Sequence, residues 1–260
     1  MVRILVVQSR LQTEQLERER NNYCRAIGDH AECIFLSALD ERLAWSYPDE
    51  FLKGQDGVIF GGSSDFDFHG GRTPRDPMRL MASMILSRSK LIITYALAQR
   101  IPILGVCFGH QLLGEMHGGC VSHDVEQKKS GTFEVRLAEE GKQDPLLADM
   151  PDSFNAQYGH KDSITKHPSG ATLLASASSC SFSMLRYGDN VYTVQFHPEL
   201  RAKDAVVALQ ANPQYIPHGA NPEDLIKDSS EASRLIPLWI ERIVAPLRLK
   251  VVSSTHARKG

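Results

Sequence analysis

The segment PILGVCFGHQLLGEMHGG, residues 102–119, constrains the fold more than any other part of the chain. It places Cys107 between an apolar stretch that predicts a buried strand, 102–106, and a segment that predicts a helix, 108–116. Glycines stand two positions before and two positions after the cysteine, where they relieve crowding if the backbone bends sharply. The thiol would then lie at a helix N-terminus, which favours thiolate over thiol. A buried packing cysteine in a glycine-rich turn would give the same pattern.

Strands and helices alternate around this segment. Apolar runs predict strands and helical spacing predicts helices in the order strand 2–7, helix 13–27, strand 32–36, helix 49–52, strand 57–60 and helix 91–99. Shorter strands with turn residues between them follow at 132–137, 171–175, 182–186 and 191–195. We therefore expect a three-layer α/β fold: a mostly parallel central sheet with helices on both faces, a small antiparallel part, and a strand-turn-helix nucleophile elbow.

One large domain fits the length of 260 residues and the 42% hydrophobic content. We expect a domain over 1–245, made of a core at 1–200 and a C-terminal helical extension at 201–245, followed by a basic tail at 246–260. Within the extension, residues 222–246 predict an amphipathic helix interrupted at Pro237.

A candidate base and its partner stand at the end of VYTVQFHPEL, residues 191–200. A thiolate nucleophile needs a base, and the base needs an acceptor that orients it. His197 ends the predicted strand, Pro198 stiffens the turn, and Glu199 could hold one imidazole nitrogen while the other faces the sulfur. Taken alone, the HPE sequence is more typical of a surface turn.

Three motifs in this order resemble one family. GVCFGHQ, then an apolar strand ending in FHPE, with VIFGGSSD upstream at 58–65, resembles the class I (triad-type) glutamine amidotransferases over about residues 1–200. The sequence segments CFGHQ and HKDSI are most similar to those of the glutaminase domains of GMP synthases. The resemblance implies an enzyme in which Cys107 attacks the side-chain carbonyl of glutamine to form a thioester, His197 moves protons, and Glu199 orients His197.

The resemblance also implies an oxyanion hole and a substrate contact. The backbone N–H groups of Phe108 and of the turn formed by Gly61 and Gly62 would stabilise the oxyanion. Gln111 lies one helical turn after Cys107 and would hold the polar end of the substrate glutamine.

A second substrate-binding segment is implied at Tyr158, Gly159 and His160. In the family, the matching strand edge grips the α-amino and α-carboxylate groups of glutamine. His160 could equally be a structural histidine bonded to Asp162. His110 points away from the open side of the elbow, so we interpret it as a packing residue.

The segment SSDFDFHGGRTPRDPMR, residues 63–79, predicts a long loop and departs from the family, with Ser63 where proline is common. Its three arginines, Arg72, Arg75 and Arg79, could bind a substrate carboxylate, but a solvated loop face is the favoured interpretation.

The function expected from these residues is hydrolysis of the γ-amide of glutamine, or of a γ-glutamyl compound, with release of ammonia or an amine. The chain would act as a stand-alone amidotransferase without a cofactor, and a synthase subunit could accept the ammonia. A γ-glutamyl peptide hydrolase and a non-catalytic binding or regulatory relative are the alternatives. A homo-oligomer also fits the sequence.

Composition argues against several other classes. The net charge of −2 gives no basic face for nucleic acid or for an anionic membrane. The apolar run near the N-terminus is too short for a signal peptide, and no apolar stretch suggests a membrane span, so we expect a cytoplasmic protein. Five widely spaced cysteines are expected to be free thiols, and no histidine stands at metal-ligand spacing, so no metal site is predicted.

Overall fold

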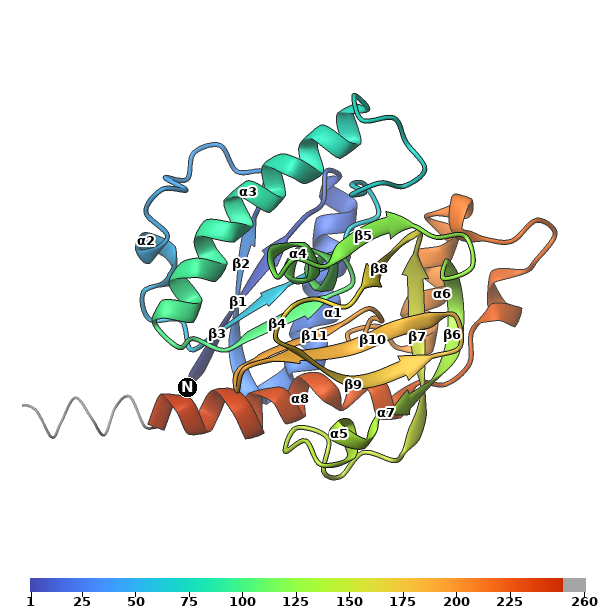
Figure 1. The fold of residues 1–260 in the computed structure, drawn as a ribbon. Helices are drawn as coiled ribbons and strands as arrows, with labels where there is room; N and C mark the ends of the chain where they lie inside the picture. Colours follow the sequence, from blue (N-terminus) through green and yellow to red (C-terminus); the bar gives the residue numbers. More distant parts are fainter. Residues whose placement is uncertain (250–260) are drawn as a thin grey trace, which may run out of the picture.

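The computed structural model describes residues 1–249, which form a central sheet with helices on both faces (Figure 1). The main sheet has nine strands in the spatial order β2-β1-β3-β4-β11-β10-β9-β6-β7. These strands are β1 Val2–Gln8, β2 Ala31–Ser37, β3 Gly57–Phe60, β4 Ile103–Val106, β6 Lys129–Leu137, β7 Ser153–His160, β9 Ala171–Ala177, β10 Cys180–Tyr187 and β11 Val191–Val194. The five strands from β2 to β11 pair in parallel, and the remaining pairings are antiparallel. The expected fold class is confirmed.

The second sheet is small, and the sequence did not predict it. Strands β5 Cys120–His123 and β8 Asp162–Lys166 pair antiparallel next to α4. Strand β7 was likewise missed as a complete strand. These elements are short or mix polar and apolar residues without a clean period, so their pairing depends on tertiary contacts.

Helices on the two faces of the sheet bury two separate apolar clusters. The α-helices are α1 Thr13–Ile27, α2 Asp49–Leu52, α3 Pro77–Ala98, α4 Phe108–Met116, α5 Glu139–Lys142, α6 Ala202–Gln210, α7 Ser230–Ser233 and α8 Leu235–Trp239. Helices α1, α7 and α8 contribute to one cluster with the sheet, whereas α3 and α4 contribute to the other. Figure 1 shows α3 and α8 on opposite sides of the parallel strands. The parallel strands are therefore buried on both faces, as their continuous apolar runs indicate.

Helix α3 corrects two sequence predictions at once. It begins at Pro77, so the loop predicted over 63–79 ends earlier and the helix predicted over 91–99 is much longer. The side chain of Asp76 caps the helix by accepting a hydrogen bond from the N–H of Met78 at 2.9 Å. Proline at the first helical position after an Asp cap is a favoured helix start. The prediction was wrong because Pro77 was interpreted as a loop residue.

By length and composition alone, α3 could also cross a membrane, since an 18-residue window has a mean hydropathy of 1.3. In the structure, its residues Ala82, Ile85, Ile92, Ile93 and Ala96 are buried in the cluster beneath it. Since 33% of that window is buried, this face accounts for only part of the apolar character of α3, and Leu80, Leu91 and Leu97 are exposed.

The C-terminal extension differs from the amphipathic helix, interrupted at Pro237, that is predicted over 222–246. Residues Pro222–Leu225 form the 3-10 helix η3, and the chain becomes helical again only at Ser230. The interruption lies at Arg234 rather than at Pro237, because proline lacks the N–H that would bond to the carbonyl four residues earlier. Helix α8 then continues through the π-helix η4 Ile240–Val244 and the helical residues 245–249. The rest of the predicted tail, 250–260, lies outside the described residues.

Candidate active site

The site lies where the carboxyl ends of adjacent parallel strands meet. Strands β1, β3, β4 and β11 are neighbours in the sheet, and a polar or glycine-rich turn follows each of them. These turns carry Arg10, Gly62, Cys107 and His197. In open α/β sheets the carboxyl ends of the strands form the usual binding crevice.

The turn at Cys107 is a strained strand-to-helix bend. Cys107 has φ 51° and ψ −99° and stands directly before α4, with its side chain buried. A Cβ atom on Gly105 would lie 2.7 Å from the carbonyl oxygen of Gly109, and one on Gly109 would lie 2.2 Å from the carbonyl oxygen of Phe60. Both glycines of the G-x-C-x-G pattern are therefore required by close backbone approach. The elbow predicted from the sequence is present.

His197 and Glu199 form a buried pair beside this turn. The Nδ1 atom of His197 lies 2.7 Å from Oε1 of Glu199, and the backbone N–H of His197 donates to the carbonyl of Gln157 at 2.8 Å. Burial by itself would lower the pKa of His197, but Glu199 and Cys107 outweigh burial through charge and hydrogen bonding and raise the pKa to about 10. An imidazolium is therefore the stable form at neutral pH. Because Nδ1 contacts Glu199, Nε2 is the nitrogen left for the sulfur.

The two glycines of the predicted oxyanion turn differ in what they contact. A Cβ on Gly62 would lie 2.8 Å from Cε1 of His197 and 3.4 Å from Cβ of Cys107, so this backbone closes directly over the pair. The N–H of Gly61 donates to the carbonyl of Val7 at 3.0 Å and belongs to the sheet. Gly61 is therefore wrong as an oxyanion donor, whereas Gly62 and Phe108 remain candidates. Phe108 is the first residue of α4, where helix N–H groups lack intrahelical acceptors.

Gln111 lies beneath the elbow rather than in an open pocket. Its Nε2 donates to the carbonyl of Asp162 at 2.8 Å and faces Oε1 of Gln195 at 3.3 Å. Both N–H bonds of the amide are thus directed at protein oxygens. Only its Oε1 atom would be left for a substrate. Gln111 could therefore accept a hydrogen bond from the substrate but not donate one, which is less than the resemblance implies.

The segment at 158–160 is divided between pocket and core. Tyr158 and Gly159 line the pocket, but the Tyr158 hydroxyl lies 3.0 Å from Oγ of Ser183 in the interior. His160 is buried, and its Nδ1 lies 3.0 Å from the carbonyl oxygen of Asp162. Burial lowers the pKa of His160 to about 3, so this ring is neutral. The structural interpretation of His160 is favoured over a substrate contact.

His110 behaves in the same way, as expected for a packing residue. It is fully buried, and its Nδ1 lies 2.8 Å from Oγ1 of Thr193. Burial lowers its pKa to about 3. Among residues 1–249, no group of three or more His, Cys, Asp or Glu side chains is arranged to hold a metal ion.

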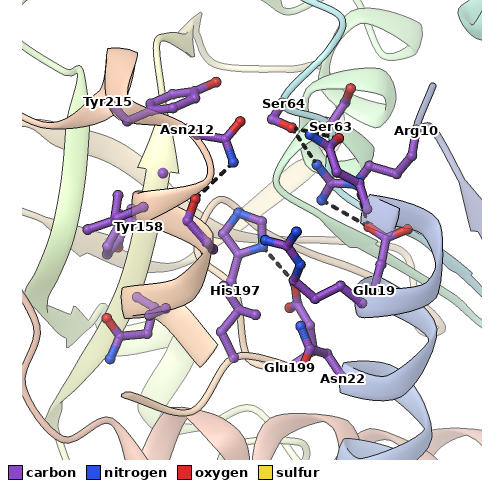
Figure 2. Close-up of a pocket in the computed structure, with 18 of the residues that line it drawn as sticks. Arg10, Glu19, Asn22, Ser63, Ser64, Tyr158, His197, Glu199, Asn212 and Tyr215 are labelled. Atoms are coloured by element: carbon purple, nitrogen blue, oxygen red, sulfur yellow. Dashed lines mark hydrogen bonds and ion pairs between the residues drawn. The ribbon is translucent and has the colours of Figure 1, made fainter. Parts of the chain in front are cut away.

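A pocket opens beside His197 and Glu199 (Figure 2). Its empty volume is ≈ 780 Å³, which includes space open to solvent. One wall comes from the strand turns and α1, and the opposite wall comes from the C-terminal extension, including Leu209, Asn212, Tyr215 and Ile226. The extension therefore covers the site, which the sequence did not reveal.

The pocket also contains an ion pair that sequence reasoning missed. Nε and Nη2 of Arg10 donate to Oε1 of Glu19 at 3.1 and 3.0 Å, and Nη1 donates to Oγ of Ser64 at 3.0 Å. Glu19 comes from the buried face of α1, and its other oxygen accepts from Gln8 at 2.9 Å. The signal available in the sequence was an arginine just after the first parallel strand, since such positions converge on the site.

Of the three arginines predicted to lie in the loop after β3, Arg72 and Arg79 have other partners, and Arg79 lies in the first turn of α3. Arg72 pairs with Asp67 at 3.0 Å and with Asp76 at 3.4 Å, and Arg79 donates to the carbonyl of Arg72 at 3.1 Å. In the described part of the chain, none of Arg72, Arg75 and Arg79 lines the pocket. These contacts do not support the hypothesis that the arginines bind a substrate carboxylate. They instead join residues within the segment 67–79.

Fold and site together define an α/β protein with a cysteine at a strand-turn-helix elbow and a buried His–Glu pair. The family model for Glutamine amidotransferase class-I matches residues 73–212, more than half of the chain. The chain belongs to the class I glutamine amidotransferase family.

Named relatives agree with this membership. The chain is 33% identical over 116 residues to a subunit of the glutamine-hydrolyzing GMP synthase of Methanocaldococcus jannaschii, covering 44% of this chain and 60% of that one. It is 30% identical over 166 residues to the corresponding GMP synthase subunit of Sulfurisphaera tokodaii, covering 64% and 78%. A glutamine amidotransferase structure from Thermotoga maritima superposes with a TM-score of 0.64 over 94% of this chain and 98% of that one. At 20% identity, this last likeness shows the fold alone.

Proposed function

We propose that this chain hydrolyses the γ-amide of glutamine or of a γ-glutamyl compound, with Cys107 as nucleophile, His197 as general acid and base, and Glu199 as the residue that orients His197. The observation that carries the proposal is the buried 2.7 Å contact between His197 and Glu199 beside the strained cysteine turn. The raised pKa of His197, about 10, supports an imidazolium beside Cys107 at neutral pH.

The first half-reaction forms a thioester. The Cys107 thiolate attacks the carbonyl carbon of the γ-amide, and the π electrons of the C=O bond move to oxygen. The N–H groups of Phe108 and Gly62 stabilise this oxyanion. When the tetrahedral intermediate collapses, the C–N bond breaks and the leaving nitrogen takes the proton from Nε2 of His197.

The second half-reaction releases the acid. Neutral His197 accepts a proton from water through Nε2 while the water oxygen attacks the thioester carbonyl. The C–S bond then breaks and returns the thiolate, so the γ-glutamyl group leaves as glutamate. The proton that crossed to the amine has been replaced by one from water, and the imidazolium–thiolate pair is restored.

Two physiological settings fit this chemistry. The relatives named as GMP synthase subunits favour glutaminase action with a separate synthase partner that accepts ammonia. The covered pocket, with a wall from the C-terminal extension, favours a γ-glutamyl peptide whose leaving group is larger than ammonia. The buried nucleophile, base and carboxylate argue against a non-catalytic relative. A cytoplasmic location and a homo-oligomer remain predictions.

The test is release of glutamate from glutamine and from γ-glutamyl peptides by wild type and by Cys107→Ser. We expect the variant to lose at least about 10³-fold in kcat, since a triad acts as a unit. Equal rates for the two proteins would exclude the proposed mechanism. Faster cleavage of peptides than of glutamine would favour the peptide hydrolase.

A further inference from the structure

The hydrolysis above makes no use of Arg10, although this arginine lines the pocket beside the reacting residues. Its side chain is 14% exposed, and its partner Glu19 is 4% exposed. Burying two charges is costly, so a buried pair of this kind is weak evidence for a stabilising role. A binding role would depend on the N–H donors of Arg10 that the pair does not use.

The guanidinium of Arg10 has N–H donors that its contacts with Glu19 and Ser64 do not use. Of the five N–H bonds of an arginine, Arg10 directs two at Glu19 and one at Ser64. Within the described residues, one N–H on Nη1 and one on Nη2 remain without an acceptor, both at the end of a side chain that lines the pocket. Figure 2 shows Arg10 held between Glu19 and Ser64 on the wall opposite Tyr158 and Tyr215. The guanidinium is oriented before any ligand binds, which lowers the entropic cost of binding.

The open donors lie close to the reaction. An atom at the Cβ position of Gly62 would be 3.5 Å from Nη2 of Arg10 and 3.4 Å from Cβ of Cys107. A group bound by Arg10 would therefore belong to the molecule whose amide is cleaved. Burial raises the pKa of Glu19 and outweighs the opposing effect of Arg10.

We propose that Arg10 binds a carboxylate of the γ-glutamyl substrate, with Glu19 and Ser64 as the residues that position its guanidinium. A carboxylate offers two oxygens to the planar donor edge of arginine. This inference rests on the proposed function. Two substrate carboxylates fit the chemistry: the α-carboxylate of the γ-glutamyl half, and a carboxylate on the amine leaving group. Substrate choice separates them.

The experiment compares three substrates with matched variants. Glutamine and γ-glutamyl ethylamide carry only the α-carboxylate, whereas γ-glutamylglycine carries a second carboxylate on its leaving group. The central variant is the double change Arg10→Gln with Glu19→Gln, which removes both charges and leaves no uncompensated buried ion. Arg10→Lys keeps the charge without the planar donors. Arg42→Gln serves as the control, since Arg42 is 89% exposed and, among residues 1–249, forms its ion pair with Asp40 on the surface.

We expect the double variant and Arg10→Lys to lower kcat/KM about 10- to 100-fold through KM, with melting temperatures close to that of the control. A loss confined to γ-glutamylglycine assigns the carboxylate to the leaving group. An equal loss on all three substrates assigns the α-carboxylate. If folded variants cleave all three substrates as wild type does, Arg10 binds no substrate carboxylate.

Calorimetry separates this inference from the proposed function. Binding of γ-glutamylglycine and glutamine is measured on Cys107→Ala, with and without the Arg10→Gln and Glu19→Gln pair. If wild type cleaves nothing but Cys107→Ala binds a ligand and loses affinity with the pair, the Arg10 assignment stands and the hydrolysis fails. Binding that is unchanged by the pair overturns the Arg10 assignment even if hydrolysis is confirmed.

Discussion

The Nδ1 atom of His197 lies 2.7 Å from Oε1 of Glu199, two residues further along the chain, and both side chains are buried. Pro198 between them restricts the backbone and holds the two side chains on one side of the turn. The carboxylate requires a proton on Nδ1, so the ring presents Nε2 to the sulfur. Tautomer and orientation are thereby set by one short segment after β11.

Replacing Glu199 by glutamine tests this relationship. An amide can present an N–H to Nδ1 and favour the wrong tautomer, so we expect kcat to fall about 10²- to 10⁴-fold while the fold is kept. Steady-state hydrolysis of a γ-glutamyl substrate measures the effect. Glu231→Gln is the control, because Glu231 lies in an exposed ion pair with Arg234. A change of less than about threefold would contradict the role of Glu199.

The raised pKa of His197 predicts how stability depends on pH. The folded value is about 10, above the usual value near 6.5, so the stabilisation is fully present below pH ~6.5 and is lost as pH rises through about 10. The difference in unfolding free energy between wild type and His197→Gln should therefore shrink between these limits. Urea denaturation at pH 6, 8 and 10 measures it, and a constant difference would refute the ion-pair assignment.

Cys107 contributes to the same shift through its charge and hydrogen bond. Removing the sulfur in Cys107→Ala should lower the pKa of His197, which NMR titration of the imidazole resonances can follow. Cys180→Ala is the matched control, because Cys180 is also buried, whereas the pKa of His197 is raised by Glu199 and Cys107. If both variants leave the His197 pKa where it is in wild type, a thiolate–imidazolium pair is absent.

Gly62 and Gly61 should respond differently to alanine. The Cβ of Gly62→Ala would lie 2.8 Å from Cε1 of His197 and displace the ring, so we expect kcat to fall at least about 10²-fold. The Cβ of Gly61→Ala meets the carboxylate of Glu19 at 3.1 Å, the end of a flexible side chain, so its effect on kcat should be smaller. Parallel kinetic assays compare the two variants. The reverse order would place the oxyanion backbone at Gly61.

The parallel half of the fold could be predicted from the sequence because its signals are local. Buried parallel strands are continuous apolar runs, and β1, β3, β4 and β11 were each recognised on that basis. The elbow could be predicted because close backbone approach admits only glycine at 105 and 109. The start of α3 was missed because proline marks both loops and helix N-termini.

The parts of the site that could not be predicted from the sequence depend on contacts between distant segments. In the sequence, Arg10 and Glu19 are two charged residues before and within a predicted helix, with no sign that they are buried. The packing of α1 on the sheet brings them together in the interior. The sequence of residues 209–226 contains no motif that would predict their position over the pocket. Its position depends on contacts such as Gln157 Nε2 donating to the carbonyl of Lys227 at 2.9 Å. The sequence also could not show which of Gly61 and Gly62 is free to act as an oxyanion donor. The structure distinguishes them because the N–H of Gly61 bonds to the carbonyl of Val7 on the neighbouring strand.

Lys129 gives a last prediction, which concerns stability rather than catalysis. The residue is 3% exposed, and in the described part of the chain Nζ has no hydrogen-bond partner. It lies 4.4 Å from the ring centroid of Phe133 and 5.3 Å from that of Tyr158, so cation–π attraction offsets only part of the desolvation cost. Burial lowers the pKa of Lys129. We expect Lys129→Met, which keeps the volume, to raise the free energy of unfolding by ~1 kcal/mol at pH 7.

The pH dependence of this gain has a definite sign. Because the folded state holds the Lys129 proton less tightly than the unfolded state, wild type gains stability as pH rises toward ~10.4, and the advantage of methionine should shrink. Urea denaturation of both proteins between pH 7 and pH 10 measures the trend. The control is Lys128→Met, because Lys128 is an exposed neighbour whose ammonium is already solvated. A Lys129→Met variant less stable than wild type at every pH would mean that the ammonium makes a favourable interaction in the core.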